Sequence, residues 1–206
     1  MTEAGIRRLL VSLVRQAGAT QRFSIGVRRV DATGQVPHVA ALDRGFRVSE
    51  RRRREFLAGR AAAAEALARR DMQGYSVSRT ERGVPVWPPG VVGSISHSRT
   101  WAVSVVFDSD IAICCGVDIE EVTAASAAPS VELHCARESL YKALSPGTGL
   151  PFRPEQWRLQ RSGSKGCWAV SVPESFPAHR LRLAPRLVTA FAPPLQAALT
   201  LAHRAA

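Results

Sequence analysis

The chain has 206 residues, of which 46% are hydrophobic and 22% are charged, a balance typical of a globular rather than a disordered protein. Its length allows one medium domain or two small ones. With 28 Lys and Arg against 17 Asp and Glu, the formal net charge is +11. Every one of these cations except Lys142 and Lys165 is an arginine, whose guanidinium binds phosphate or carboxylate through a planar fork. The composition therefore favours an anionic partner.

Residues 1–16 predict an amphipathic helix, because Arg7, Arg8 and Arg15 interrupt its apolar positions. The same arginines argue against a signal peptide. No apolar run approaches the ~20 residues that a membrane span needs, and the four cysteines lack the C-x-x-C spacing of metal sites. We therefore expect reduced, mostly buried thiols in a cytoplasmic protein.

The middle of the chain predicts a helix followed by three strands. Ser49 can cap a helix that runs to about Arg70. Residues 91–97 and 101–107 are two short runs joined by a polar link, which predicts a β-hairpin, and residues 111–120 predict a third strand.

Two further elements are expected toward the C-terminus. A helix should start at Ser130 and end before Pro146, because proline removes a helical hydrogen bond. Residues 156–172 predict another hairpin, which turns at Ser162-Gly163-Ser164. The final stretch is apolar but interrupted by prolines, so no element is predicted there.

An acidic pair, Asp118 and Glu120, lies at the end of the third predicted strand. Alternate side chains of a strand share a face, so both carboxylates project beside the small residues Ala112, Cys114 and Gly116, which leave room for a bulky group. Two close carboxylates repel each other, and a hard divalent cation such as Mg²⁺ relieves that repulsion. The alternative is two ordinary acids at a solvent-exposed strand end.

Several polar segments are candidates for an anion site. The hydroxyls and imidazole of residues 94–98 suit a phosphate, although a satisfied turn explains them equally well. Residues 51–54 are four arginines in a first helical turn, where the helix dipole favours acids, so a nearby anion would explain them. Arg60 falls in line with the apolar stripe of the same helix. The rigid loop at residues 82–88 is, taken by itself, a plain connection.

The second helix carries Glu138 and Lys142 nearly opposite its apolar face. A glutamate four residues before a lysine is a common stabilising pair on a helix surface. Taken alone, these two residues predict nothing more than such a pair.

The order of these motifs is more specific than any one of them. Phe-Leu-Ala-Gly-Arg (56–60), Gly-x-Pro-x-Trp-Pro (83–88), Gly-Ser-Ile-Ser-His-Ser (93–98), Gly-Val-Asp-Ile-Glu (116–120) and Glu-Ser-Leu-Tyr-Lys (138–142) follow one another along the chain. This series resembles the 4′-phosphopantetheinyl transferases, in particular the group with two similar halves that includes siderophore-synthesis enzymes and surfactin-type activators.

The resemblance implies an α+β fold of two pseudo-symmetric α/β halves with the active site between them. Residues 1–112 would form an arginine-rich half that grips the nucleotide, and residues 113–206 a half with the metal carboxylates. The implied reaction is the Mg²⁺-dependent transfer of 4′-phosphopantetheine from coenzyme A to a serine of an apo acyl or peptidyl carrier protein, with release of adenosine 3′,5′-bisphosphate. We expect a monomer with no membrane or nucleic-acid partner.

The same resemblance assigns roles to residues of this chain. Asp118, Glu120 and Glu138 would hold Mg²⁺ against the pyrophosphate, and Glu138 or Lys142 would be nearest the proton transfer. Asp118, Glu138 and Lys142 would therefore also contact coenzyme A. The remaining nucleotide and phosphate contacts would be Arg51, Arg60, Arg82, Gly83, Val84, Pro85, Ser96 and His97.

The chain departs from the family pattern near its second helix. His134 and Arg137 stand where the family usually has an aromatic residue and a lysine, and the segment between Glu120 and Glu138 is short. This leaves open a rebuilt carrier site, a narrower partner range, or a relative without activity that still binds coenzyme A or a carrier protein. An arginine-rich nucleic-acid-binding protein is a more distant alternative, since phosphate contacts dominate such binding, but no nucleic-acid-binding motif accompanies the charge.

Overall fold

The computed structural model describes residues 1–31, 48–123, 128–148, 157–163, 166–171 and 185–203. These residues form three helices, α1 (Glu3–Gln16), α2 (Glu50–Ala68) and α3 (Ala128–Thr148). The strands are β1 (Phe23–Arg29), β2 (Ser78–Arg79), β3 (Pro85–Val86), β4 (Val91–His97), β5 (Trp101–Asp108), β6 (Ala112–Glu121), β7 (Arg158–Arg161), β8 (Cys167–Ser171), β9 (Arg186–Ala192) and β10 (Leu195–His203). Within the described ranges, no helix combines the length and hydropathy needed to cross a membrane.

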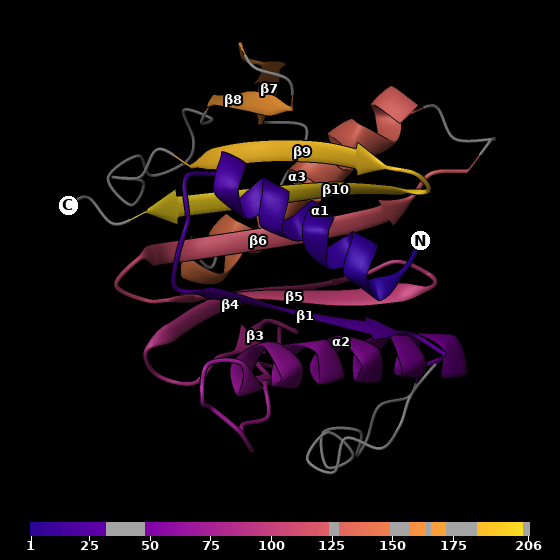
Figure 1. Ribbon diagram of the computed structural model, residues 1–206, viewed down its shortest axis with the longest axis vertical. Helices are drawn as coiled ribbons and strands as arrows, with labels where there is room; N and C mark the ends of the chain where they lie inside the picture. The colour runs from indigo at the N-terminus through magenta and orange to yellow at the C-terminus, as the bar shows by residue number, and fades with distance from the viewer. Residues whose placement is uncertain (32–47, 124–127, 149–156, 164–165, 172–184, 204–206) are drawn as a thin grey trace.

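The strands form two antiparallel sheets and one short ribbon. The first sheet has the order β1-β5-β4 and the second the order β6-β10-β9-β8-β7, while β2 pairs with β3. Strand β4 of the first sheet packs along β6 of the second. Helix α1 crosses one face of this layer, and α2 and α3 lie on the opposite side (Figure 1). Because both faces are covered, β5 is buried from Trp101 to Phe107.

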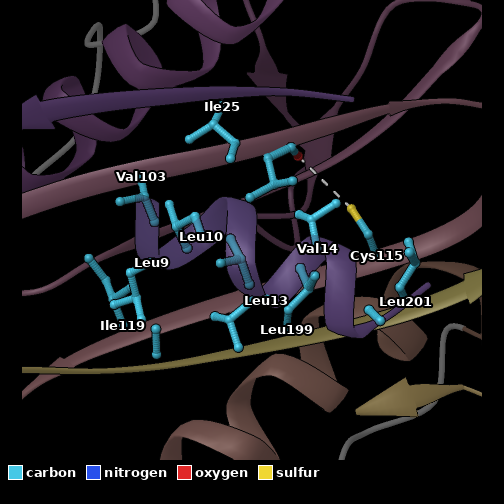
Figure 2. Close-up of a cluster of buried hydrophobic side chains, with 14 of the residues drawn as sticks. Leu9, Leu10, Leu13, Val14, Ile25, Val103, Cys115, Ile119, Leu199 and Leu201 are labelled. Atoms are coloured by element: carbon cyan, nitrogen blue, oxygen red, sulfur yellow. Dashed lines mark hydrogen bonds between the residues drawn. The ribbon is translucent and has the colours of Figure 1, made fainter. Parts of the chain in front are cut away.

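The main hydrophobic core lies between α1 and both sheets. Leu9, Leu10, Leu13 and Val14 of α1 point toward side chains of strands from each sheet (Figure 2). These strand residues are alternate positions, among them Ile25, Val103, Cys115, Ile119, Leu199 and Leu201. A single helix thus ties the two sheets into one core, which holds β4 against β6.

The two sheets repeat one arrangement of strand, helix and hairpin. The order β1-β5-β4 with α2 corresponds to the order β6-β10-β9 with α3. In each unit the first strand carries a glycine that faces the helix: a Cβ on Gly26 would lie 1.8 Å from the carbonyl oxygen of Ala62, and a Cβ on Gly116 would lie 1.9 Å from that of Ser139. The expected α+β fold with two similar halves is confirmed.

The predicted elements of the middle region are confirmed. The Ser49 hydroxyl caps α2 by accepting from the Arg52 amide at 3.3 Å. The hairpin at residues 91–97 and 101–107 matches β4 and β5, and the third strand is β6, shifted by one residue. The N-terminal helix is α1, and the hairpin near the C-terminus is β7 and β8. Part of its predicted turn, at residue 164, lies outside the described residues.

The predicted bounds of the second helix were wrong. Helix α3 begins at Ala128 and includes Pro146 rather than ending before it. Proline is tolerated here because it lies in the last turn, where the ring removes one hydrogen bond without a long helix beyond it to disrupt. Strands β1, β9 and β10 were not predicted.

Candidate active site

A cavity of about 950 Å³ lies between α2 and α3, over the place where β4 meets β6. The first wall comes from α2, β4 and the loop at residues 82–87, and the second wall comes from β6 and α3. Nearly all of the predicted site residues line it: Arg60, Arg82, Gly83, Val84, Pro85, Ser96, His97, Asp118, Glu120, Glu138 and Lys142. Arg51 is not among the lining residues.

Arg60 is the most deeply buried cation of the first wall, with 5% of its surface exposed. Its guanidinium lies 4.8 Å from the ring centre of Phe56, and Arg79 approaches the same ring at 5.6 Å. Burial, with a smaller effect of the Arg79 charge, lowers the pKa of Arg60 to about 10. Its Nε has no hydrogen-bond partner in the described part of the chain. A buried cation of this kind favours an anionic ligand.

The arginines that open α2 have carboxylates nearby within the helix. Arg51 Nε donates to Glu55 at 2.8 Å, and Arg52 lies 3.4 Å from the same carboxylate. Arg53 and Arg54 lie 3.7 and 3.6 Å from Glu50. Glu50 and Glu55 therefore account for part of the charge balance that the sequence suggested an external anion would provide.

The loop at residues 82–87 closes one side of the cavity. Gly83 adopts a φ of +81°, a conformation that favours glycine, and its amide donates to the Thr80 carbonyl at 2.9 Å. Trp87 packs flat against β4, where a Cβ on Gly93 would lie 2.6 Å from the indole. The turn thus presents main-chain and aromatic groups to the cavity.

The serines of β4 connect the two sheets. Ser94 Oγ accepts from the Val117 amide at 3.0 Å, and Ser96 Oγ accepts from the Ile119 amide at 3.3 Å. Ser98 Oγ donates to Glu121 at 2.8 Å. The Ser94 and Ser96 hydroxyls replace the backbone carbonyls that a paired strand would supply, so the serine motif has a structural task in addition to lining the cavity.

Asp118 is the buried acid of the opposite wall, with 3% of its surface exposed. Its Oδ1 accepts from Ser96 Oγ at 2.8 Å and from Lys142 Nζ at 2.5 Å. Its Oδ2 is buried and has no hydrogen-bond partner within the described ranges. The neighbouring Glu120 has a raised pKa, first because of burial and then because of the charges of Asp118 and Glu138. This wall concentrates negative charge that needs compensation.

Helix α3 brings Glu138 and Lys142 to the cavity because it crosses β6 in direct contact at Gly116. The small face of β6 thus receives a bulky group, as the sequence predicted, and that group is the helix. Equivalent positions in the first half hold a pair of reversed charge, Arg28 and Glu65 at 2.5 Å. The surface ion pair predicted between Glu138 and Lys142 does not form, because Lys142 binds Asp118 instead.

Comparison with known proteins identifies relatives for this arrangement. Residues 46–107 match a family model described as the 4′-phosphopantetheinyl transferase N-terminal domain. Part of the chain is therefore similar to the 4′-phosphopantetheinyl transferases. It is 31% identical over 121 residues to 4′-phosphopantetheinyl transferase Npt of Nocardia iowensis, covering 48% of this chain and 54% of that protein.

Two further relatives carry the name enterobactin synthase component D. That of Salmonella typhimurium is 37% identical over 111 residues, covering 50% of this chain and 44% of the relative. That of Escherichia coli K12 is 43% identical over 89 residues, covering 42% and 38%. The chain thus spans about half the length of the relatives it matches, or somewhat less. Residues 118, 120 and 138, which carry the acids, lie outside the stretch matched by the family model.

The donor set of the acidic wall suits the metal that the family resemblance implies. Asp118, Glu120 and Glu138 offer carboxylate oxygens, which are the ligands Mg²⁺ prefers, and the unpartnered Oδ2 of Asp118 is a free acceptor. Within the described ranges, no three Asp, Glu, His or Cys side chains already form a metal-binding group. The carboxylates share a cavity without being gathered into a finished coordination site.

Several cavity residues were not predicted from the sequence. Glu55, Phe56 and Trp87 line the first wall, and Tyr141 lines the second; Arg52, also a lining residue, was a candidate only as part of the basic run at residues 51–54. Glu55 had a sequence signal, because it begins a stripe of small residues, Ala58, Ala62 and Ala66, that are all buried. An acid at the start of a buried stripe marks a carboxylate directed into the protein.

Proposed function

We propose that the chain transfers 4′-phosphopantetheine from coenzyme A to a serine of an apo acyl or peptidyl carrier protein, in a Mg²⁺-dependent reaction that releases adenosine 3′,5′-bisphosphate. The observation that carries this proposal is one cavity with a cationic wall and a carboxylate wall, supplied by two similar halves. Coenzyme A has both a pyrophosphate and a 3′-phosphate, which such opposed walls can bind together with a divalent cation.

The first wall would bind the nucleotide. Arg60 is a buried cation ready for a phosphate, and the turn of residues 82–85 offers main-chain groups and the Arg82 side chain. Ser96 and His97 reach the cavity from β4. Arg51 would contribute only from the rim, since its Nε is engaged by Glu55.

The second wall would handle the reacting groups. A magnesium ion, when bound, neutralises charge on the pyrophosphate, and Asp118, Glu120 and Glu138 are the residues that would hold it. Glu138 would accept the proton of the carrier serine, directly or through a water molecule. The serine oxygen then forms a bond to phosphorus while the pyrophosphate P–O bond breaks toward adenosine 3′,5′-bisphosphate. Lys142, held by Asp118, would face the negative charge of the leaving phosphate.

The halves and the partners are part of the same proposal. We place the nucleotide-gripping half in residues 1–112 and the carboxylate half in residues 113–206, and we propose a monomer because one chain supplies both walls. The partner is an acidic carrier protein, which the net charge of +11 would attract. No nucleic-acid or membrane partner is proposed.

The proposal is tested by mixing the chain with coenzyme A, MgCl₂ and a panel of apo acyl and peptidyl carrier proteins. Intact-mass spectrometry should detect one phosphopantetheinyl group on a carrier, and EDTA should abolish the product. A carrier with its acceptor serine changed to alanine is the substrate control.

Glu138→Gln should lower the transfer rate by about 10²–10⁴-fold, the range expected for loss of a general base, while part of the coenzyme A affinity remains. Glu132→Gln, on the same helix but outside the cavity, should turn over normally. Unchanged turnover in Glu138→Gln contradicts the proposed role. Coenzyme A binding without transfer to any carrier would instead identify a relative that has lost activity.

A further inference from the structure

Glu55 is an acid buried in a wall that otherwise gathers cations. It has 6% of its surface exposed and lines the cavity together with Arg52, Arg60 and Arg82. A carboxylate here opposes the binding of an anion such as coenzyme A, and its burial carries a desolvation cost. Because Glu55 is unfavourable for both ligand binding and stability, its presence needs another explanation. Its contacts provide one.

The contacts of Glu55 are the groups that face the cavity from α2 and β4. Its two carboxylate oxygens are approached by Arg51 at 2.8 Å and by Arg52 at 3.4 Å, and His97 Nδ1 lies 3.9 Å away. Burial alone would raise the pKa of Glu55, but the hydrogen bonds from Arg51 and Arg52 and the charge of Arg51 lower it overall. Glu55 is therefore ionised at neutral pH.

The third member of this cluster is His97. Arg52 NH1 lies 2.6 Å from His97 Nε2, and an arginine can only donate, so Nε2 must accept. The ring is then neutral and carries its proton on Nδ1, the nitrogen that faces Glu55. Burial and the Arg52 charge lower the pKa of His97, which agrees with a neutral ring.

The second half of the fold contains the same contact with different chemistry. The two halves can be aligned at the helix residues that contact the strand glycines, Ala62 in α2 and Ser139 in α3. Glu55 lies seven residues before Ala62, and Glu132 lies seven residues before Ser139. Glu132 accepts from Thr189 Oγ at 2.6 Å. Thr189 occupies the register position that corresponds to His97, because their strand partners are Ala198 and Ala102. A helix carboxylate thus faces a strand side chain at corresponding positions in both halves, through a hydrogen bond of 2.6 Å in the second half and an approach of 3.9 Å in the first.

In the first half, the carboxylate and its strand partner face the cavity. Glu132 is not a lining residue, whereas Glu55, Arg52 and His97 all are. The hydroxyl of Thr189 is replaced by an imidazole. An arginine contacts the carboxylate in both halves, Arg161 on Glu132 and Arg52 on Glu55, but Arg52 also contacts the imidazole. These changes convert a structural contact into one that fixes two phosphate-binding side chains.

We propose that Glu55 is a positioning residue that holds Arg52 and His97 in the arrangement that receives the phosphates of coenzyme A. This inference rests on the proposed function, and it adds Arg52 to the groups that bind the nucleotide. It also sets two effects of Glu55 against each other. Electrostatic repulsion alone predicts that removing the Glu55 charge strengthens coenzyme A binding, whereas positioning predicts that it weakens binding.

The test measures coenzyme A affinity of the full chain by isothermal titration calorimetry. Glu55→Gln should bind about tenfold more weakly, because Arg52 and His97 lose their charged partner. Glu55→Asp keeps the charge but shortens its reach, so it should also weaken binding. Glu132→Gln removes the equivalent charge in the second half and should leave the affinity unchanged. Circular dichroism checks that each variant is folded.

Two further readouts separate positioning from a general loss of structure. Because Glu55 acts partly through Arg52 and partly through His97, the double variant Arg52→Gln/Glu55→Gln should lose less binding free energy than the sum of the two single losses. The His97 imidazole, followed by NMR, should titrate at lower pH in Glu55→Gln, since Glu55 opposes the pKa-lowering charges of Arg52 and Lys142, and Asp118 alone then remains to raise it.

Binding by Glu55→Gln that equals or exceeds that of the wild type overturns the inference, as does a fully additive double variant. In either case the proposed function stands, because the wild-type chain still binds coenzyme A. A wild-type chain that fails to bind coenzyme A would instead remove the proposed function and this inference together.

Discussion

Arg60 is the residue in which the requirements of stability and binding conflict most directly. Its guanidinium is buried, its Nε has no partner in the described part of the chain, and its nearest compensation is the ring of Phe56. Cation–π contact recovers only about 1–2 kcal/mol, which is less than the cost of burying a charge that its surroundings compensate incompletely. The fold therefore keeps a buried, incompletely compensated cation at the place where the proposed ligand brings phosphate.

Arg60→Met keeps most of the side-chain volume and removes the charge. We expect the free energy of unfolding in urea to rise by about 1–2 kcal/mol, because a buried charge is replaced by an apolar group. Coenzyme A affinity should fall by roughly tenfold or more, because a charge-assisted contact is lost. Arg53→Met, an exposed change on the same helix, should alter neither quantity. Destabilisation together with unchanged affinity would assign Arg60 a purely structural role.

At the level of elements, the contact between α3 and β6 decides where the catalytic candidates lie. The helix backbone touches the strand at Gly116, and Glu138 and Lys142 project from one side of this contact into the cavity. A helix held at side-chain distance would move both residues away from Asp118. Gly116 therefore affects the site only by allowing α3 to lie close to β6, which places Glu138 and Lys142 near Asp118.

Gly116→Ala tests this contact. The added Cβ would lie 1.9 Å from the Ser139 carbonyl oxygen, so α3 must shift, and we expect a loss of about 3 kcal/mol or more in the free energy of unfolding. Gly5→Ala provides a control inside a helix: its nearest contact would be 3.4 Å, and the change should be neutral or stabilising by up to about 1 kcal/mol. Equal stability of the two variants in urea unfolding would show that α3 is not fixed at this point.

At the level of the whole molecule, α1 makes the two sheets one cooperative unit. Its apolar residues contact strands of both sheets (Figure 2). The serines of β4 add polar contacts along β6. Each half alone would leave its side of this core exposed to water. The cavity between the halves therefore depends on a helix that lies on the opposite face of the sheets.

Leu13→Ala should reveal this dependence. Leu13 is fully buried in the shared core, and its truncation should lower the free energy of unfolding by about 2–5 kcal/mol. Both sheets should unfold in one transition, followed by circular dichroism and by tryptophan fluorescence, which reports on Trp87 and Trp101 in the first half and on Trp157 and Trp168 in the second. Arg8→Ala, on the exposed face of α1, should change stability little. Two separate transitions in Leu13→Ala would contradict a single shared core.

Elements with a clear local signal could be predicted from the sequence. Ser49 marked the start of α2, and the alternation from Trp101 to Phe107 marked β5. Strand β10 gave no such signal, because alanines weaken its strand propensity and prolines precede it. Its place in the sheet comes from pairing with β6 and β9, which are distant or unrecognised in the sequence.

The residues of the candidate site could be predicted from motifs in the sequence. The contacts between residues of different elements could not. Asp118 and Glu120 were recognised from strand periodicity, and the structure adds that Lys142 crosses from α3 to bind Asp118. Glu55 resembles an ordinary i, i+4 partner of Arg51. Its place at the start of a stripe of small residues indicates burial, but its contact with His97 of β4 is visible only in the fold. Contacts between distant elements depend on packing, which local patterns do not encode.

The two ion pairs of reversed charge, Arg28 with Glu65 and Asp118 with Lys142, have a consequence for how this protein divides its tasks. Each pair joins the first strand of a half to its long helix, at matching positions and at the same separation. The backbone therefore accepts the acid on either partner, so the side chains placed on this shared framework, rather than the framework itself, determine which half carries the buried acid of the cavity.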